Sequence, residues 1–199
     1  MKNVIFTIGH SNHPKEYFLE LLQAYQVSVV VDVRSIAASR YNPQYNGKNL
    51  KHYLHQHRIE YVHMPEAFGA RQTNPAVLDQ NGQVDFKKLQ ETQVFKNGIG
   101  SLDFLLSQDQ TIALMCAEAD PLSCHRFFMI AVYLYQHGYE LKHILKDKTV
   151  KSQTDLEEEL IKKFAKKISN DLFHTNYRET ALEKIYRLKN NEMGFIPSN

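Results

Sequence analysis

Three runs rich in β-branched and other apolar residues restrict the fold of this chain more than any other feature. They are NVIFTI (3–8), SVVVDV (28–33) and TIALMC (111–116). Their apolar character is continuous rather than alternating, which indicates strands covered on both faces, as in a parallel sheet. Two weaker candidates are 60–64 and 139–145. The sequence therefore predicts a sheet of about five strands.

Helical patterns fill the gaps between these runs. Apolar residues recur at helical spacing over 13–26, 48–58, 85–107 and 124–138, with a break in the third pattern near Asn97-Gly98. Strands that alternate with helices are typical of βαβ units. The expected fold class is α/β, with an open, mostly parallel sheet flanked by helices.

The pattern changes after about residue 147. Two amphipathic, charge-rich helices are expected at 155–169 and 179–193. We therefore divide the chain into an α/β domain (1–147) and a C-terminal helical extension (148–199). The two helices are also candidates for a homodimer contact.

Composition narrows the class of protein. Of the 199 residues, 43% are hydrophobic and 23% are charged, and the formal charge is +2, so charge alone gives no reason to expect nucleic-acid binding. No apolar run approaches the roughly 20 residues that a membrane span needs. The N-terminus lacks the apolar region and cleavage site of a signal peptide. We expect a cytoplasmic protein without a membrane partner, in which the two cysteines stay reduced.

Titratable residues gather where the predicted strands end. In open α/β sheets, ligands bind beyond the carboxyl ends of the strands, and strand interiors here stay apolar while their ends carry polar side chains. The candidate catalytic residues are His10, Cys116, Glu118, Cys124 and His125. The candidate substrate-binding residues are Ser11, Asp32, Arg34, Arg40, Tyr61 and Arg126.

Each of these residues has a structural alternative. A cysteine that ends a buried strand, such as Cys116, is more often a small core residue than a nucleophile. His10 is equally suited to satisfying a buried polar group, and Asp32 and Arg34 lie on one face of their strand and suit an ion pair. For Cys124, beside a histidine and an arginine, neither interpretation is favoured.

Several standard motifs are excluded. Cys116 and Arg126 are ten residues apart with no glycine between them, which fits neither a phosphatase nor a rhodanese loop. Two cysteines exclude a closed thiolate-rich zinc site, although a mixed site that includes His10 stays open. No P-loop and no GxGxxG motif is present, so a nucleoside triphosphate or dinucleotide cofactor is not expected. We predict no other cofactor and assign no residue as a metal ligand.

Four segments resemble a known family. They are TIGHSN (7–12), VVVDVRSIAASRYNPQYN (29–46), IEYVHMPEAFGAR (59–71) and CAEADPLSCHR (116–126). In this order they resemble the bacterial and archaeal family called domain of unknown function 488, over about residues 3–146. The resemblance implies a compact α/β domain and supports the candidate residues as a set, with Ser39 added, but it implies no reaction. Where relatives tend to have Leu-Gly-Gly, this chain has Phe68-Gly69-Ala70.

Three functional hypotheses follow. The first is an enzyme that carries out hydrolysis or group transfer on an anionic substrate, such as a nucleotide or nucleobase compound, held by arginines. The alternative is a nucleic-acid-binding protein, or an enzyme acting on a base in DNA or RNA, that uses the basic and aromatic residues of 34–53. A metal-dependent enzyme is the third.

Overall fold

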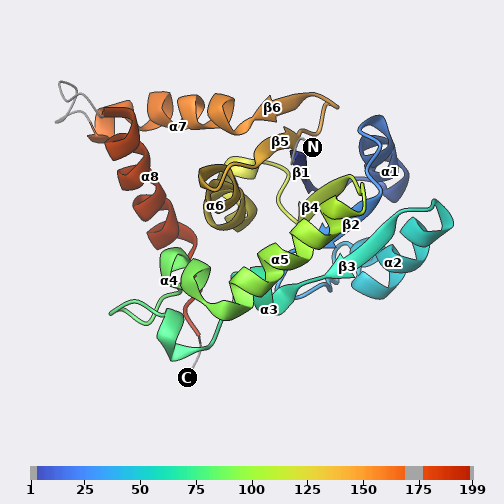
Figure 1. Cartoon of the computed structure of the whole chain (residues 1–199), viewed down its shortest axis with the longest axis horizontal. Coiled ribbons are helices and arrows are strands. Elements are labelled where there is room, and N and C mark those ends of the chain that lie inside the picture. Colours follow the sequence, from blue (N-terminus) through green and yellow to red (C-terminus); the bar gives the residue numbers. More distant parts are fainter. Residues whose placement is uncertain (1–3, 169–176, 198–199) are drawn as a thin grey trace.

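The computed structural model describes residues 4–168 and 177–197. A six-stranded sheet with the order β3-β2-β4-β1-β5-β6 forms the centre of the molecule (Figure 1). Its strands are β1 (Val4–Gly9), β2 (Val29–Asp32), β3 (Glu60–His63), β4 (Ile112–Cys116), β5 (Glu140–Ile144) and β6 (Val150–Ser152). The first five are parallel, and β6 pairs with β5 in the antiparallel sense.

The predicted α/β class and mostly parallel sheet are confirmed, and all five expected strands are present. The first of them was expected to begin at residue 3, which lies outside the described residues. The sixth strand, β6, falls in the stretch that the sequence assigned to the helical extension. It is three residues long and its side chains are half-buried, so no apolar run marks it in the sequence.

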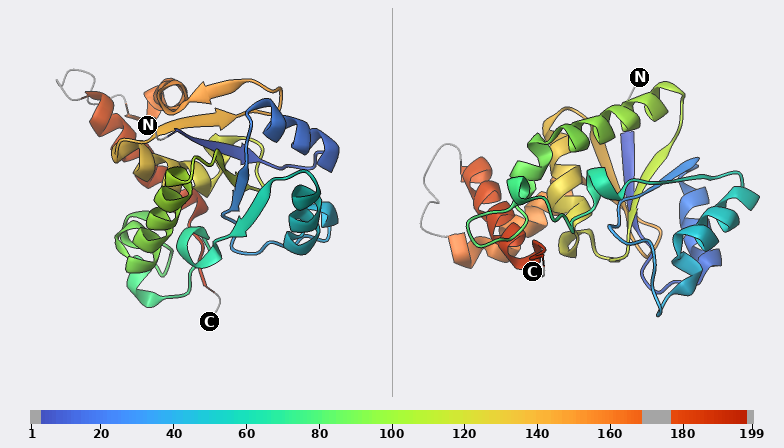
Figure 2. Two further views of the ribbon diagram at one scale, coloured as in Figure 1. Left: turned by 45° about the vertical axis from the view of Figure 1, so that its right-hand side comes forward. Right: turned by 90° about the horizontal axis from the view of Figure 1, so that it is seen from below.

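Helices cover both faces of the sheet (Figure 2). On one face lie α1 (Lys15–Ala24) and α2 (Gly47–Gln56), whose Leu22 and Leu54 pack with Val30 of β2. The neighbouring valines, Val29 and Val31, belong to the core on the opposite face. Because side chains alternate along a strand, the continuous apolar run of β2 supplies both cores.

The opposite face carries the remaining helices. They are α3 (Pro65–Phe68), α4 (Phe86–Glu91), α5 (Gln93–Ser107), the π-helical segment η4 (Arg126–Ala131) continued by α6 (Val132–Gln136), α7 (Gln153–Ile168) and α8 (Tyr177–Met193). Residues 4–168 also contain three short 3-10 turns: η1 (Pro43–Tyr45), η2 (Pro75–Val77) and η3 (Pro121–Ser123). No helix in the described ranges is long and apolar enough to cross a membrane.

The expected break near Asn97-Gly98 is wrong. The helical pattern is interrupted at Thr92, whose hydroxyl accepts a hydrogen bond from the backbone N–H of Phe95 and caps α5. Gly98 lies inside α5, where a Cβ atom would come within 2.6 Å of the Cβ of Ala67. This glycine therefore allows α5 to pack closely against α3.

The C-terminal helices join the sheet through a buried polar chain. Nδ1 of His143 on β5 lies 2.9 Å from the Thr7 hydroxyl, and Nε2 lies 3.0 Å from Oε1 of Gln153 on α7. Gln153 donates to Glu157, which in turn pairs with Arg178 of α8. The predicted boundary at residue 147 falls within the β5–β6 hairpin, and α7 and α8 pack into the same core as the sheet.

Candidate functional site

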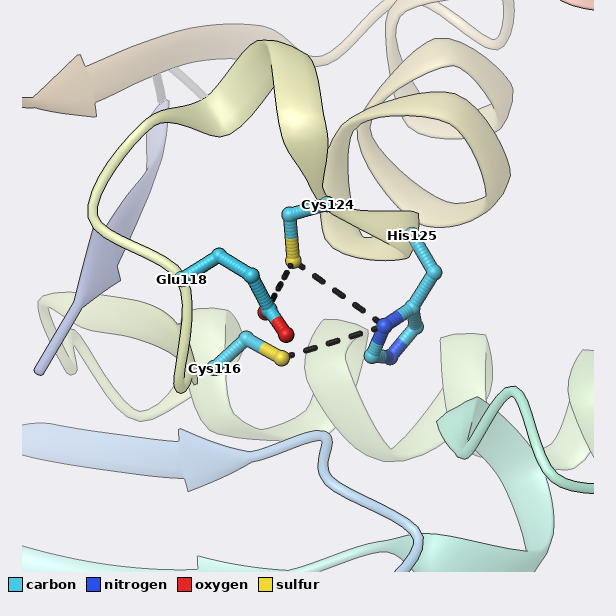
Figure 3. Close-up of side chains that lie close together, drawn as sticks. All are labelled: Cys116, Glu118, Cys124 and His125. Atoms are coloured by element: carbon cyan, nitrogen blue, oxygen red, sulfur yellow. Dashed lines mark hydrogen bonds between the residues drawn. The ribbon is translucent and has the colours of Figure 1, made fainter. Parts of the chain in front are cut away.

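Four side chains meet beyond the carboxyl end of β4 (Figure 3). These are Cys116, Glu118, Cys124 and His125, here called the four-residue cluster. Their sulfur, oxygen and nitrogen donor atoms all lie within 4.8 Å of one another. β4 lies between β2 and β1 in the sheet, so the cluster sits at the edge where α/β sheets bind ligands.

Cys116 is the last residue of β4 and is 2% exposed. It is in register with Gly9 at the end of β1, and the backbone N–H of His10 donates to its carbonyl oxygen over 2.9 Å. Gly9 has no room for a side chain, because a Cβ atom would lie 1.8 Å from the carbonyl oxygen of Glu118. The loop that carries Glu118 thus folds directly onto the end of β1.

Two polar residues hold this loop in shape. The carboxylate of Asp120 accepts a hydrogen bond from the N–H of Leu122 and caps η3. The buried guanidinium of Arg126 donates to the carbonyl oxygens of Glu118, at 2.6 Å, and Ala119, at 3.2 Å. Arg126 therefore stabilises the backbone of this loop. It does not line the cavity onto which Glu118 opens.

The helix expected over 124–138 begins at Arg126, two residues later than the sequence pattern indicates. The Ser123 hydroxyl donates to the carbonyl oxygen of Asp120, and the helical segment starts at Arg126 as a π-helix. The N–H of Arg126 donates to the Sγ atom of Cys124 at 3.4 Å. Irregular π-helical turns are frequent at functional sites, and here Cys124 and His125 directly precede the turn and lie close to Cys116 at the end of β4.

His125 is oriented by the backbone of the neighbouring strand. Its Nε2 lies 3.1 Å from the carbonyl oxygen of Val33, so this nitrogen carries the proton and donates it. The other nitrogen, Nδ1, faces both sulfurs, at 3.8 Å from Cys116 and 3.9 Å from Cys124. The imidazole can therefore receive a proton from either thiol or take part in metal binding.

The two thiols have opposite electrostatic settings. Burial opposes ionisation of Cys124, but a hydrogen bond with Cys116 and the charges of Arg126 and His125 bring the pKa of Cys124 well below its usual value. The same hydrogen bond, with burial, raises the pKa of Cys116. The cluster thus favours a thiolate at Cys124.

Glu118 and His125 respond to that thiolate. Burial, followed by the charge of Cys124, raises the pKa of the Glu118 carboxyl, whose Oε2 lies 3.0 Å from the Cys124 sulfur. Burial tends to lower the pKa of His125, but the neighbouring Cys124 outweighs it and raises that pKa. Protons can therefore be exchanged among three adjacent groups, which is a requirement of acid–base catalysis.

A cavity of about 440 Å³ opens onto the cluster. All four cluster residues line it, together with Arg34 and Arg71, and its outer wall includes Met193 and Phe195 from the C-terminal segment. The guanidinium of Arg71 lies 5.9 Å from the ring centre of Phe195. Small-molecule sites have volumes of about 300–1,000 Å³, so the cavity is large enough for a substrate.

Four other predicted residues form a buried polar chain beside the cavity. Arg34 makes two side-chain hydrogen bonds to Asp32, and the Tyr61 hydroxyl donates to Asp32 at 2.6 Å. Nη1 of Arg34 also donates to Nε2 of His10, whose ring stacks on Tyr45. Burial and the charge of Arg34 lower the pKa of His10 to about 4, so His10 is a neutral acceptor.

The remaining predicted residues lie apart from the cavity. Ser11 adopts a positive φ of 50° and bonds to Asn12, while Arg40 is exposed. The Ser39 hydroxyl accepts hydrogen bonds from the N–H groups of Tyr41 and Asn42 and shapes its own turn. Ser11, Ser39 and Arg40 are absent from the cavity lining.

Comparison with known proteins identifies the family. The model of the family described as "Domain of unknown function DUF488" matches residues 14–133, more than half of the chain. The protein belongs to the DUF488 family. No curated protein and no solved structure matched the chain in the same comparisons.

The DUF488 match includes the whole four-residue cluster. It begins after β1 and ends within α6, so it leaves out β5, β6 and the C-terminal helices. His10 and Ser11 lie before the matched range, whereas Phe195 lies after it. The cavity is therefore built mainly from the DUF488 region, with one wall added by the C-terminal segment.

Sequence reasoning missed the contribution of that segment. Met193 ends a charge-rich helix, Phe195 lies just after it, and neither belongs to a motif, so nothing in the local sequence places them near the cluster. Their position depends on long-range backbone pairing, in which the N–H of Val84 donates to the carbonyl oxygen of Phe195. The same holds for Ser35, which lines the cavity and whose hydroxyl accepts the N–H of Arg71.

Proposed function

We propose that this DUF488 protein is an enzyme that catalyses hydrolysis or group transfer on an anionic small molecule. The observation that carries the proposal is the convergence of two thiols, a carboxyl group and an imidazole within 4.8 Å at the floor of a substrate-sized cavity. Shifted protonation equilibria in a concave site are typical of catalytic groups, although structural clusters share them.

The charges around the cavity favour a negatively charged substrate. Arg71 is exposed at the rim and forms no ion pair with a carboxylate of the described residues. Arg34 also lines the cavity, but its guanidinium is already bound by Asp32 and the carbonyl oxygen of Tyr45. Arg71 is therefore the residue that we assign to recognition of a phosphate or carboxylate, with Arg34 adding positive potential.

The apolar wall suggests what else the substrate carries. Phe195 and Met193 face the same cavity as Arg71, and Ile36, which is 58% exposed, lies on its rim. An aromatic ring can stack on a planar group, and the neighbouring arginine can bind a negative charge on the same molecule. Nucleotides and related nucleobase compounds combine these two features, so they are the substrate class to test first.

A substrate screen tests the proposal. Purified protein is incubated with phosphorylated sugars, nucleotides and modified nucleosides, and turnover is followed by mass spectrometry. We expect Glu118→Gln to lower turnover of any substrate found by at least about 100-fold, as is usual for loss of a general acid or base. Arg71→Ala should raise KM, while Arg187→Ala, at an exposed position on α8, is the matched control. Turnover that is unchanged in folded Glu118→Gln and Cys124→Ser proteins would refute the proposal.

Nucleic-acid binding is a second candidate function, supported by one feature. Tyr41 is 88% exposed and lies beside the exposed Arg40, a pair suited to stacking and phosphate contact. The other tyrosines expected to stack are less available, because Tyr45 is fully buried and Tyr53 lies under the amine of Lys15. Binding to single-stranded DNA that weakens steeply with salt and is lost in Tyr41→Ala would favour it.

Two further expectations belong with this proposal. A cytoplasmic, reducing environment suits the two cysteines, which are free thiols in the structure. A homodimer through α7 and α8 stays a prediction. Both helices already contribute buried residues to the core, so a dimer would have to use their outer faces, and sedimentation of the purified protein tests it.

A further inference from the structure

The donor atoms of the four-residue cluster suit a transition metal ion. Sulfur and imidazole nitrogen are the donors that Zn²⁺ binds in proteins, whereas Mg²⁺ and Ca²⁺ prefer oxygen. A tetrahedral Zn²⁺ with bonds of about 2.3 Å to sulfur and about 2.0 Å to nitrogen separates those atoms by about 3.6 Å. In the protein, Nδ1 of His125 lies 3.8 Å from the Cys116 sulfur and 3.9 Å from the Cys124 sulfur. Shortening each of these nitrogen–sulfur distances by a few tenths of an ångström would give the separation that the ion requires.

The surroundings of His125 prepare it as a ligand. Histidines that bind metals usually donate their second ring N–H to a backbone carbonyl or carboxylate, which fixes the tautomer and the ring orientation. Here Nε2 donates to the carbonyl oxygen of Val33 at 3.1 Å. Nδ1 is thereby left with its lone pair directed between the two sulfurs (Figure 3).

The two sulfurs are similarly held. Cys116 is fixed by the sheet at the end of β4, and the Cys124 sulfur accepts the N–H of Arg126 at 3.4 Å. Both cysteines are at least 98% buried as residues, yet both line the cavity, so an ion could enter from that side. Rigid positions, outer hydrogen bonds and an entry path are the features expected of a preformed metal site.

Glu118 differs from the other three residues. It lies on the loop, it is the exposed member of the cluster, and its carboxylate faces the cavity. Three protein ligands and one open position are the arrangement of catalytic zinc sites, whereas structural sites have four protein ligands. Glu118 is placed where the open position would face the substrate.

We propose that Cys116, Cys124 and His125 bind one Zn²⁺ ion and that Glu118 acts on water at the fourth position. This inference deepens the proposed function and, for the role of Glu118, rests on it. Both cysteines bind the ion as thiolates, and any proton that either sulfur still holds goes to solvent. In hydrolysis, Glu118 takes one proton from the water, the hydroxide forms the new bond to the substrate, and the departing group receives the proton as its bond breaks.

Metal binding can be measured without a substrate. The full chain is produced without a histidine tag, its metal content is determined, and Zn²⁺ affinity is measured in competition with a chromophoric chelator. We expect one Zn²⁺ per chain.

Cys116→Ser, Cys124→Ser and His125→Ala should weaken binding by more than about 100-fold, since even outer hydrogen-bond partners contribute 10–100-fold. Glu118→Gln should keep the affinity within about threefold, which the three-ligand assignment requires. His52→Ala, at an exposed histidine on α2, is the control.

A second measurement uses the wild-type protein alone, in case the ligand variants fail to fold. Stoichiometric Zn²⁺ should protect both thiols from alkylation, and Co²⁺ should give the sulfur-to-metal absorption band of a two-thiolate tetrahedral site. Failure of Zn²⁺ to protect the thiols, or unchanged affinity in the folded ligand variants, would overturn the metal site. If turnover is then still lost in Cys124→Ser, the metal site is rejected and the proposed enzymatic function is retained. If Zn²⁺ binds as expected but Glu118→Gln leaves turnover intact, the metal site is supported and the role assigned to Glu118 is wrong.

Discussion

Arg126 donates from Nη1 to the backbone carbonyl oxygen of Glu118 over 2.6 Å, although the two residues come from different ends of the loop. This contact, with the one to Ala119, ties the loop to the start of the helix that follows it. Arg126 is fully buried, so its role is to fix the backbone that positions the Glu118 carboxylate. Arg126 thus has a structural role and does not bind a substrate anion.

Arg126→Met tests that role. The change leaves two carbonyl oxygens without their donor, and we expect it to lower the free energy of unfolding by about 2–4 kcal/mol. Urea denaturation gives the stability, and hydrogen exchange should show faster opening of residues 117–120. Arg187→Met, at an exposed position, should change neither quantity. Equal stability of the two variants would show that the hydrogen bonds from Arg126 to the loop do not stabilise the fold.

Gly9→Ala tests the same loop at its contact with the end of β1. The added methyl group would overlap the carbonyl oxygen of Glu118, so the loop must move or β1 must shift. Overpacking of this kind costs about 1–3 kcal/mol. Gly100 of α5 offers a matched control, because a Cβ atom there meets nothing within 4 Å. Since alanine is the better helix former, Gly100→Ala should stabilise the protein by about 0.5–1 kcal/mol in thermal unfolding.

These contacts show what the sequence could and could not predict. The strands and the gathering of polar residues at their carboxyl ends follow from local patterns, and β4 ends at Cys116 as expected. The functions of individual arginines do not follow in this way. The pairing of Arg34 with Asp32 was one of two alternatives seen in the sequence, but nothing there distinguishes Arg40, which is exposed, from Arg126, which is buried behind the loop. Only long-range packing decides among these states.

The members of the cluster could be named from the sequence, but their geometry could not. The spacing of the cysteines matched no standard zinc motif, because Cys116 ends a strand, whereas Cys124 and His125 directly precede a π-helical segment. His10 was left open as the histidine of a mixed metal site, and the structure instead bonds it to Arg34. The histidine that faces the sulfurs is His125, whose orientation depends on the distant carbonyl group of Val33.

Tyr61→Phe probes the buried polar chain. The Tyr61 hydroxyl donates to Oδ2 of Asp32 at 2.6 Å, and its loss leaves a buried carboxylate with one fewer donor. Hydrogen bonds to charged groups contribute about 1.5–3 kcal/mol, so we expect a loss of that size in urea denaturation. Tyr41→Phe is the control, since Tyr41 is 88% exposed and its hydroxyl should contribute little. A loss below about 0.5 kcal/mol in Tyr61→Phe would mean that Arg34 alone satisfies Asp32.

His143 makes the protein sensitive to acid. Burial, with the charge of Arg126, lowers the pKa of His143 in the folded protein from 6.5 to about 3. The folded state therefore holds this histidine neutral, whereas the unfolded chain binds a proton below about pH 6.5. The resulting stability is fully present above pH 6.5 and is lost as the pH falls toward 3, by up to about 1.4 kcal/mol per pH unit.

Unfolding free energy measured from pH 7.5 to pH 4 tests this effect. His143→Gln removes the titrating group, so its stability should fall less steeply over that range even if it starts lower. His52→Gln, at an exposed histidine, should keep the wild-type slope. Parallel curves for His143→Gln and the wild-type protein would show that other groups cause the acid sensitivity.

Phe195→Ala tests the wall that the C-terminal segment adds to the DUF488 region. The ring of Phe195 lines the cavity beside Arg71, while its backbone is held by Val84 independently of the side chain. Removing the ring should therefore leave the segment in place and enlarge the cavity. For any substrate found in the screen, we expect KM to rise by about tenfold, the effect of losing about 1.4 kcal/mol of binding, with kcat less affected. Ile196→Ala, at the next residue, which is 60% exposed and outside the cavity lining, should leave both constants unchanged. An unchanged KM in Phe195→Ala would place substrate recognition entirely within the DUF488 region.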